Sequence, residues 1–167
     1  MSAGKLKTRE IAELAVITAL LIGAKEAMNA LPNINPVTLL LLVTVLCYGW
    51  KALYVAFAFT AAEFAIFGAG LWTLAYIYVW PLLIAAAMPF RANRSPLFWS
   101  AFSAVFGLCF GALCSIPYLF LGGWRTALSW WVAGIPYDLL HAAGNAVLSF
   151  LLLLPLYRVV ERTRSKS

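Results

Sequence analysis

The sequence predicts an all-α integral membrane protein with six transmembrane helices and both termini in the cytoplasm. Of the 167 residues, 64% are hydrophobic and only 11% are charged, more apolar surface than a water-soluble domain of this length can bury. Long apolar segments alternate with short polar ones, and the basic residues gather in every second polar segment. We therefore expect one transmembrane, substrate-binding domain that covers residues 1–167.

The amino-terminal half contains three expected helices. The first covers about residues 9–31 and ends at Pro32, which opens the polar turn LPNINP. A short second helix covers about residues 36–47, fewer than an ordinary bilayer requires. The aromatic turn YGWK leads into a third helix at about residues 52–67, which Gly68-Ala69-Gly70 ends.

Three further helices are expected in the second half. The fourth covers about residues 71–90, with Pro81 as a kink near its middle. The basic segment RANRSP separates it from a fifth helix at about residues 97–121, where Gly107, Gly111 and Ser115 form a close-packing face. A loop that starts at Gly122 then leads to the sixth helix, at about residues 137–160.

The basic residues predict the orientation of the six helices. With a cytoplasmic amino terminus, only Lys25 and Arg125 among the Lys and Arg residues fall outside the cytoplasmic segments, as the positive-inside rule requires. The expected cytoplasmic cations are Lys5, Lys7, Arg9, Lys51, Arg91, Arg94, Arg158, Arg162, Arg164 and Lys166.

The most polar stretch of the chain is GGWRTALSWWVAGIPYDLLHAAGN, residues Gly122 to Asn145. In it Asp138, His141 and Asn145 are spaced i, i+3, i+7 and share one helix face. A charge near the middle of a membrane helix costs roughly 2.5–3.5 kcal/mol, so this face indicates either partners in the bundle or a wet cavity. We interpret it as one wall of a binding site; a structural hydrogen-bond network between helices is the alternative.

The predicted topology brings other polar and aromatic side chains to the same outer depth, which suggests a pocket open to the outside. The candidate substrate-binding residues are Glu26, Glu63, Trp72, Tyr76, Tyr118, Trp130, Asp138, His141 and Asn145. Each group also has a structural interpretation. The aromatic residues fit an interfacial belt, Lys25 and Glu26 fit a snorkelling pair at a helix end, and Glu63 needs a partner wherever it lies.

Several other functions lack their sequence signatures. The net charge of +6 lies at the chain ends and between apolar segments, which favours membrane orientation over nucleic-acid binding. Cys47, Cys109 and Cys114 form no CxxC pair, a single histidine does not make a usual zinc site, and neither GxSxG nor HExxH occurs. We expect no enzymatic activity, no metal and no cofactor.

Four features together resemble the substrate-binding S components of energy-coupling factor (ECF) transporters. They are the size, the six helices with a short second one, the pair Ala15-xxx-Ala19, and the outward-facing site. The segments YGWKALY and AGIPYDLLHAAGN look like those of a vitamin-type branch, and the resemblance covers essentially the whole chain.

The resemblance implies a prokaryotic plasma-membrane protein that binds a vitamin-like micronutrient at its outer end. It implies that the loop from Pro32 to Pro36 closes over the ligand. It also implies that Ala15 and Ala19 dock on a separate transmembrane coupling subunit, driven by two ATPase subunits. The chain itself has no GxxxxGK[ST] phosphate-binding loop.

The residues of the predicted pocket narrow the ligand class. Glu26, Glu63 and Asp138 against one lysine favour a neutral or cationic ligand, and the many rings favour a flat heteroaromatic. A vitamin B6 form such as pyridoxamine, or the aminopyrimidine half of thiamine, fits this description. Two alternatives remain open: a small proton-coupled carrier that uses Glu63 and Asp138, and, less favoured, an intramembrane enzyme that uses Asp138 with His141.

Overall fold

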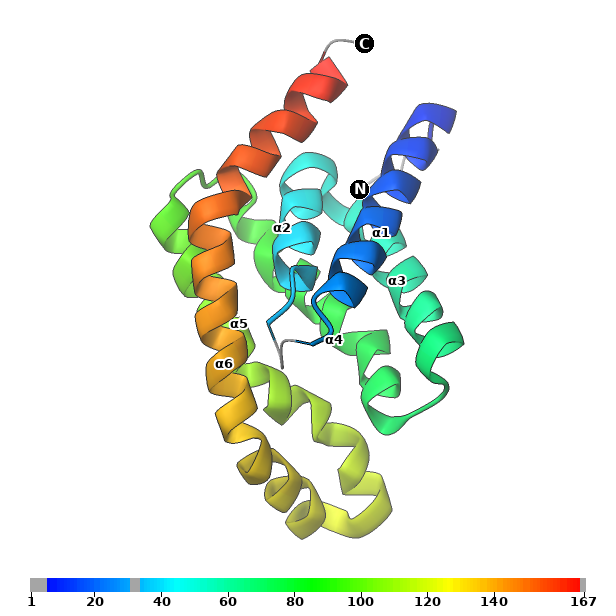
Figure 1. The fold of residues 1–167 in the computed structure, drawn as a ribbon, viewed down its shortest axis with the longest axis vertical. Helices are drawn as coiled ribbons and strands as arrows, with labels where there is room; N and C mark the ends of the chain where they lie inside the picture. The colour runs from blue at the N-terminus through cyan, green and yellow to red at the C-terminus, as the bar shows by residue number, and fades with distance from the viewer. Residues whose placement is uncertain (1–5, 31–33, 166–167) are drawn as a thin grey trace.

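The computed structural model describes residues 6–30 and 34–165, and these form helices without any strand (Figure 1). The α-helices are α1 (Thr8–Ala27), α2 (Val37–Tyr48), α3 (Ala52–Phe67), α4 (Leu71–Ala87), α5 (Pro96–Cys114) and α6 (Ile116–Ser165). Two 3-10 turns, η1 (Gly49–Lys51) and η2 (Met88–Phe90), follow α2 and α4. The predicted all-α class is confirmed.

Four helical stretches in the described residues are long and apolar enough to cross a membrane. They are Val37–Phe67, Leu71–Phe90, Pro96–Cys114 and Ile116–Ser165, and the first of them joins α2, η1 and α3. Helix α1 is not among them, because it has charged residues in its first and last turns. The long apolar helices are compatible with a multi-pass membrane protein.

Helix α2 lies at the centre of the bundle. Every residue of α2 except Leu40 is buried, and the helix packs against α1, α3, α4 and α6. Its sequence is apolar around its whole circumference, which is the pattern of a helix with neighbours on all sides. The short second helix thus forms the core around which the longer helices are arranged.

Helices α5 and α6 pack closely along their length. A Cβ atom at Gly107 would lie 2.7 Å from the backbone of Ala142, so glycine at this position lets the two backbones approach. Farther along the pair, the hydroxyl groups of Ser103 and Ser149 are 2.7 Å apart and hydrogen-bonded. This packing holds the polar face of α6 against α5.

The predicted loop between the fifth and sixth helices is wrong in its length, although the chain breaks helical geometry directly after residue 121 as expected. Helix α5 ends at Cys114, α6 begins at Ile116, and the stretch expected as a loop before residue 137 lies within α6. The non-helical residues there are Gly122 and Gly123, and Gly123 has a φ of 71°, which favours glycine. The Thr126 hydroxyl donates to the Gly122 carbonyl at 2.8 Å, and the helix then continues through Pro136.

The predicted end of the first helix is also wrong. Helix α1 ends at Ala27, where the Met28 N–H donates to the carbonyls of Ala24 and Lys25, both at 3.2 Å. The Asn29 N–H donates to the Glu26 carbonyl at 3.1 Å. The two i to i−3 bonds, to the carbonyls of Lys25 and Glu26, tighten the last turn and stop the helix before residue 31. Residues 31–33, which include Pro32, lie outside the described residues.

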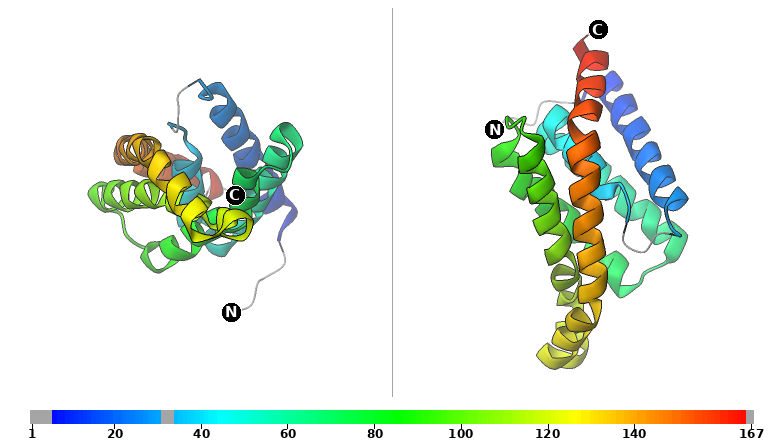
Figure 2. Two further views of the ribbon diagram at one scale, coloured as in Figure 1. Left: turned by 90° about the horizontal axis from the view of Figure 1, so that it is seen from below. Right: turned by 60° about the vertical axis from the view of Figure 1, so that its left-hand side comes forward.

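The start of α1 and the end of α6 lie at the same end of the bundle, beside the α2–α3 turn and the α4–α5 connection (Figures 1 and 2). Side chains join these segments: Arg9 donates to the Thr163 carbonyl at 2.8 Å, and Lys51 pairs with Glu10 at 2.6 Å. We call this the basic end. The α3–α4 turn lies toward the other end, and the turn at Gly122 and Gly123 inside α6 extends farthest there (Figure 2).

Candidate functional site

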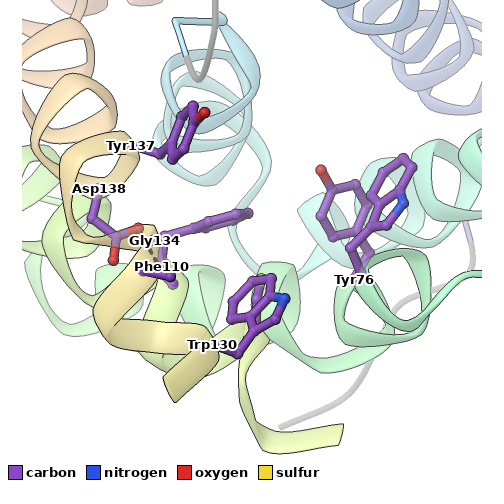
Figure 3. Close-up of a pocket in the computed structure, with 10 residues that line it drawn as sticks. Tyr76, Phe110, Trp130, Gly134, Tyr137 and Asp138 are labelled. Atoms are coloured by element: carbon purple, nitrogen blue, oxygen red, sulfur yellow. Dashed lines mark hydrogen bonds between the residues drawn. The ribbon is translucent and has the colours of Figure 1, made fainter. Parts of the chain in front are cut away.

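A pocket of about 440 Å³ opens between α4, α5 and α6, away from the basic end (Figure 3). Its volume lies in the range of about 300–1,000 Å³ that small-molecule sites occupy. The lining consists of aromatic and small residues with one carboxylate: Trp72, Tyr76, Phe110, Gly111, Cys114, Trp130, Ala133, Gly134, Tyr137 and Asp138. An apolar pocket with one acidic group is suited to a flat ligand that carries a hydrogen-bond donor.

The Asp138 carboxylate belongs to the pocket lining, with one oxygen hydrogen-bonded and the other buried without a partner among the described residues. Oδ1 accepts a hydrogen bond from the backbone N–H of Gly111 at 2.9 Å. Oδ2 has no hydrogen-bond partner within residues 6–30 and 34–165, although the residue is only 4% exposed. Buried carboxylate oxygens normally have partners, so Oδ2 is positioned to accept an N–H from a ligand.

The aromatic rings of α4 form the opposite wall. Tyr76 packs edge-to-face on Trp72 and on Trp80, with ring centroids 5.4 and 5.1 Å apart. Figure 3 shows Tyr76 across the pocket from Tyr137 and Asp138, with Trp130 at the lower edge. A planar ligand bound between these walls would contact aromatic rings on one side and a carboxylate on the other.

Glu63 has the partner that the sequence analysis required. The Lys25 ammonium lies 3.1 Å from Glu63 Oε2 and 2.8 Å from Glu26 Oε1, and it covers the Phe67 ring at 4.1 Å from the centroid. The Glu63 side chain is fully buried and the Lys25 side chain is 12% exposed. This ion-pair cluster joins α1 to α3, and neither carboxylate lines the pocket.

His141 and Asn145 share the face of α6 with Asp138, but neither of them lines the pocket. The His141 ring lies against the edge of Phe110 at a centroid distance of 4.6 Å and is 1% exposed. The Asn145 side chain donates to the Ser103 carbonyl at 3.3 Å, which links α6 to α5. The polar face predicted from sequence therefore divides into a pocket residue, a covered histidine and a structural asparagine.

Tyr118 lies next to the pocket without lining it. Its ring stacks on Trp130 with centroids 4.8 Å apart, across the turn at Gly122 and Gly123. Tyr118 and Trp130 also line a second, more open hollow of about 480 Å³ with Arg125. Of the nine candidate residues, four line the pocket: Trp72, Tyr76, Trp130 and Asp138.

The residues that sequence reasoning missed come mainly from α5 and from the turn of α6 before Asp138. They are Phe110, Gly111, Cys114, Ala133, Gly134 and Tyr137. Gly111 belongs to the small-residue face that predicted close packing, and Tyr137 directly precedes Asp138. The contribution of Phe110 had no signal in the sequence, because one phenylalanine in an apolar helix resembles every other.

Ala15 and Ala19 are both exposed on α1, on the outer surface of the bundle. A shallow groove of about 170 Å³ between α1 and α3 includes Ala15 and Tyr54 in its lining. Part of the expected gating loop, residues 32 and 33, lies outside the described residues. In the rest of that loop, the Asn35 side chain accepts a hydrogen bond from the Val37 N–H at 3.1 Å.

Among the residues that the structure describes, no three His, Cys, Asp or Glu side chains come together as a possible metal site. Comparisons of the chain with protein-family models, curated proteins and solved structures found no match.

Proposed function

We propose that the chain is the membrane-embedded substrate-binding S component of an ECF-type transporter, which takes up a small vitamin-like heteroaromatic. The observation that carries the proposal is the pocket between α4, α5 and α6, where Asp138 lies opposite a wall of aromatic rings and its Oδ2 has no hydrogen-bond partner within residues 6–30 and 34–165. A buried carboxylate oxygen without a partner is costly in a stable bundle, which favours a role in binding.

The pocket chemistry favours a flat cation as the ligand. Trp72, Tyr76 and Trp130 offer ring faces and edges, and Asp138 Oδ2 offers an acceptor for a protonated amine or ring N–H. Pyridoxamine, or a thiamine-related aminopyrimidine, carries both features. A ligand with several carboxylates would meet an acidic residue and no basic residue in the lining.

Transport would depend on partners. The exposed alanines of α1 offer a small-residue surface on which the helix of a transmembrane coupling subunit can pack closely. Two ATPase subunits would supply the energy, since the chain contains no GxxxxGK[ST] phosphate-binding loop. In this proposal the basic end faces the cytoplasm of a prokaryotic cell and the pocket faces outward, so that a ligand enters from outside.

A proton-coupled carrier is the second candidate, because a buried carboxylate such as Asp138 can also bind a proton. Proteoliposomes separate the two functions. A carrier takes up radiolabelled ligand alone in response to a pH gradient, whereas an S component requires the coupling module and ATP.

Co-purification tests the proposed assembly. We would co-express the chain with the ECF coupling subunit and ATPases of its source and replace Ala15 and Ala19 together by leucine. The double variant is expected to lose the coupling subunit and keep its ligand, because bulky side chains prevent close helix approach. Ala143→Leu, at an exposed alanine of α6, is the matched control and should retain the complex. Equal loss in both, or retention in both, contradicts the assignment.

A further inference from the structure

Two buried polar side chains next to the pocket have no hydrogen-bond partner in the described part of the chain. The two side chains are Trp80, whose indole N–H is unpaired, and His141, whose two ring nitrogens are both unpaired. Each residue is 1% exposed. Trp80 comes from α4 and His141 from α6. Unpaired polar atoms this deep in a folded protein are uncommon, so their presence on two facing helices calls for a shared explanation.

Phe110 is the side chain that connects these groups to the pocket. Its ring centroid lies 4.6 Å from that of His141 and 5.5 Å from that of Trp80, and Phe110 itself lines the pocket. The covered polar groups therefore lie directly behind a residue of the pocket wall.

We propose that the pocket continues into an inner polar subsite, covered by Phe110 and formed by Trp80 and His141, that recognises a hydrogen-bond acceptor on the ligand. The ligand is a ring with a protonated amine or N–H at one edge, which donates to Asp138 Oδ2. Its opposite edge carries an acceptor, which receives a hydrogen bond from the Trp80 N–H. His141 supplies one further donor or acceptor. This inference rests on the proposed function, because it concerns the same pocket.

Packing alone does not explain a tryptophan at position 80. Its ring also packs against the aromatic rings of Phe59, Tyr76 and Phe106, with centroids 6.0, 5.1 and 6.1 Å away. A phenylalanine would make the same kind of contacts without burying an unpaired N–H. Burying the unpaired indole N–H therefore lowers the stability of the unliganded bundle. A hydrogen-bond acceptor on a ligand can offset this cost. A buried water is the competing explanation, and the test separates the two.

The test compares two tryptophan-to-phenylalanine variants. Trp80→Phe removes an unpaired N–H, whereas Trp99→Phe is the matched control, because Trp99 is also fully buried but donates to the Asn93 carbonyl at 3.1 Å. Both substitutions remove ring volume from a fully buried site, but only Trp99→Phe also loses a hydrogen bond, so in the unliganded protein in detergent Trp80→Phe should lower the midpoint of thermal unfolding less than Trp99→Phe does. Trp99→Phe should lower it by a few degrees.

Binding is measured with two probes, pyridoxamine and benzylamine, by isothermal titration calorimetry. Both carry a protonatable amine on a ring, but only pyridoxamine has acceptors on its ring. The wild-type protein and Trp99→Phe should bind pyridoxamine at least about tenfold more tightly than benzylamine. This ratio is expected for one extra hydrogen bond in a buried site. Trp80→Phe should reduce that ratio to about threefold or less.

The outcomes distinguish this inference from the proposed function. If the wild-type protein binds both probes equally, or if Trp80→Phe keeps the wild-type ratio, the inner subsite is overturned and the pocket assignment stands. If Trp80→Phe destabilises the protein as much as Trp99→Phe, a buried water pairs the indole and the subsite is overturned as well. If neither probe binds the wild-type protein, the proposed ligand class and the inner subsite fail together.

Discussion

The backbone N–H of Gly111 on α5 donates to Oδ1 of Asp138 on α6 at 2.9 Å. A methyl group at position 111 would overlap the same carboxylate. This contact fixes the orientation of Asp138, which lines the pocket, and leaves Oδ2 without a hydrogen-bond partner among the described residues. Helix pairing and ligand binding are therefore expected to depend on the same residue pair.

The first prediction concerns Gly111→Ala. The added methyl group should force Asp138 aside, destabilise the protein by about 1–3 kcal/mol and abolish binding of pyridoxamine. Thermal unfolding and calorimetric titration in detergent measure the two effects. Gly23→Ala on α1 is the control, since a Cβ there meets no atom within 4 Å. If the two variants behave alike, the Gly111–Asp138 contact has no structural role.

The second prediction concerns the Lys25–Glu63 pair. Lys25→Met leaves a fully buried carboxylate without its cation and should destabilise the protein by about 3–5 kcal/mol. Adding Glu63→Gln to this variant should recover most of the loss, since the amide carries no charge to compensate. A double-mutant cycle of denaturant unfolding measures the coupling.

The same double variant tests the role of Glu63 in binding. Because neither Lys25 nor Glu63 lines the pocket, the refolded double variant should bind ligand within about threefold of the wild-type affinity. A much larger loss of affinity with normal stability would place Glu63 in the binding site, as the sequence analysis predicted.

The third prediction concerns Asn145→Ala. This substitution removes the hydrogen bond to the Ser103 carbonyl and should cost about 1 kcal/mol of stability. Ligand affinity should stay unchanged, because Asn145 is absent from the pocket lining. Reduced ligand affinity at unchanged stability would contradict the structural role of Asn145 and place it in the binding site.

The fourth prediction concerns orientation in the membrane. The background is a variant with Cys47, Cys109 and Cys114 replaced by alanine. In it, Arg94→Cys reports the basic end of the bundle and, in a separate protein, Arg125→Cys reports the opposite end. A membrane-impermeant maleimide should label the Arg125→Cys protein in intact cells and the Arg94→Cys protein only after lysis. The opposite pattern would place the basic end outside.

Composition and helix-ending residues were sufficient to predict much of the fold. The third helix matches its predicted range of residues 52–67, because Gly68 adopts a φ of 80° and ends it where the glycine pattern indicated. The second helix differs by one residue at each end. Both helices are bounded by residues whose backbone preferences are strong enough to decide the boundary locally.

The predicted loop before residue 137 failed for a physical reason. A glycine pair followed by an arginine and several tryptophans suggested an interfacial loop, but only Gly122 and Gly123 leave helical geometry. After Gly123 only Gly134 and Pro136 disfavour a helix, and glycine and proline are both tolerated inside membrane helices. One tight turn was thus taken for a long loop.

The candidate site was only partly predictable, because its polar residues are divided by tertiary contacts. Helical spacing placed Asp138, His141 and Asn145 on one face, but the neighbours on α5 decide which of them reaches the pocket. Likewise, the sequence required a partner for Glu63 and could not identify it as Lys25 on another helix. Contacts between distant helices carry this information, and spacing along one helix does not.

Native mass spectrometry of the purified protein, compared with its Asp138→Asn variant, tests the central claim most directly. Asparagine keeps the size of the side chain and an oxygen for the Gly111 N–H, while the negative charge is lost and an NH2 donor replaces the second acceptor oxygen. The wild-type protein should carry a small cationic heteroaromatic, and the variant should bind it about 10–100-fold more weakly while unfolding at a similar temperature. Equal ligand occupancy in both proteins, or a wild-type protein that retains no ligand from a panel of vitamins, would contradict the assignment of this pocket as a binding site.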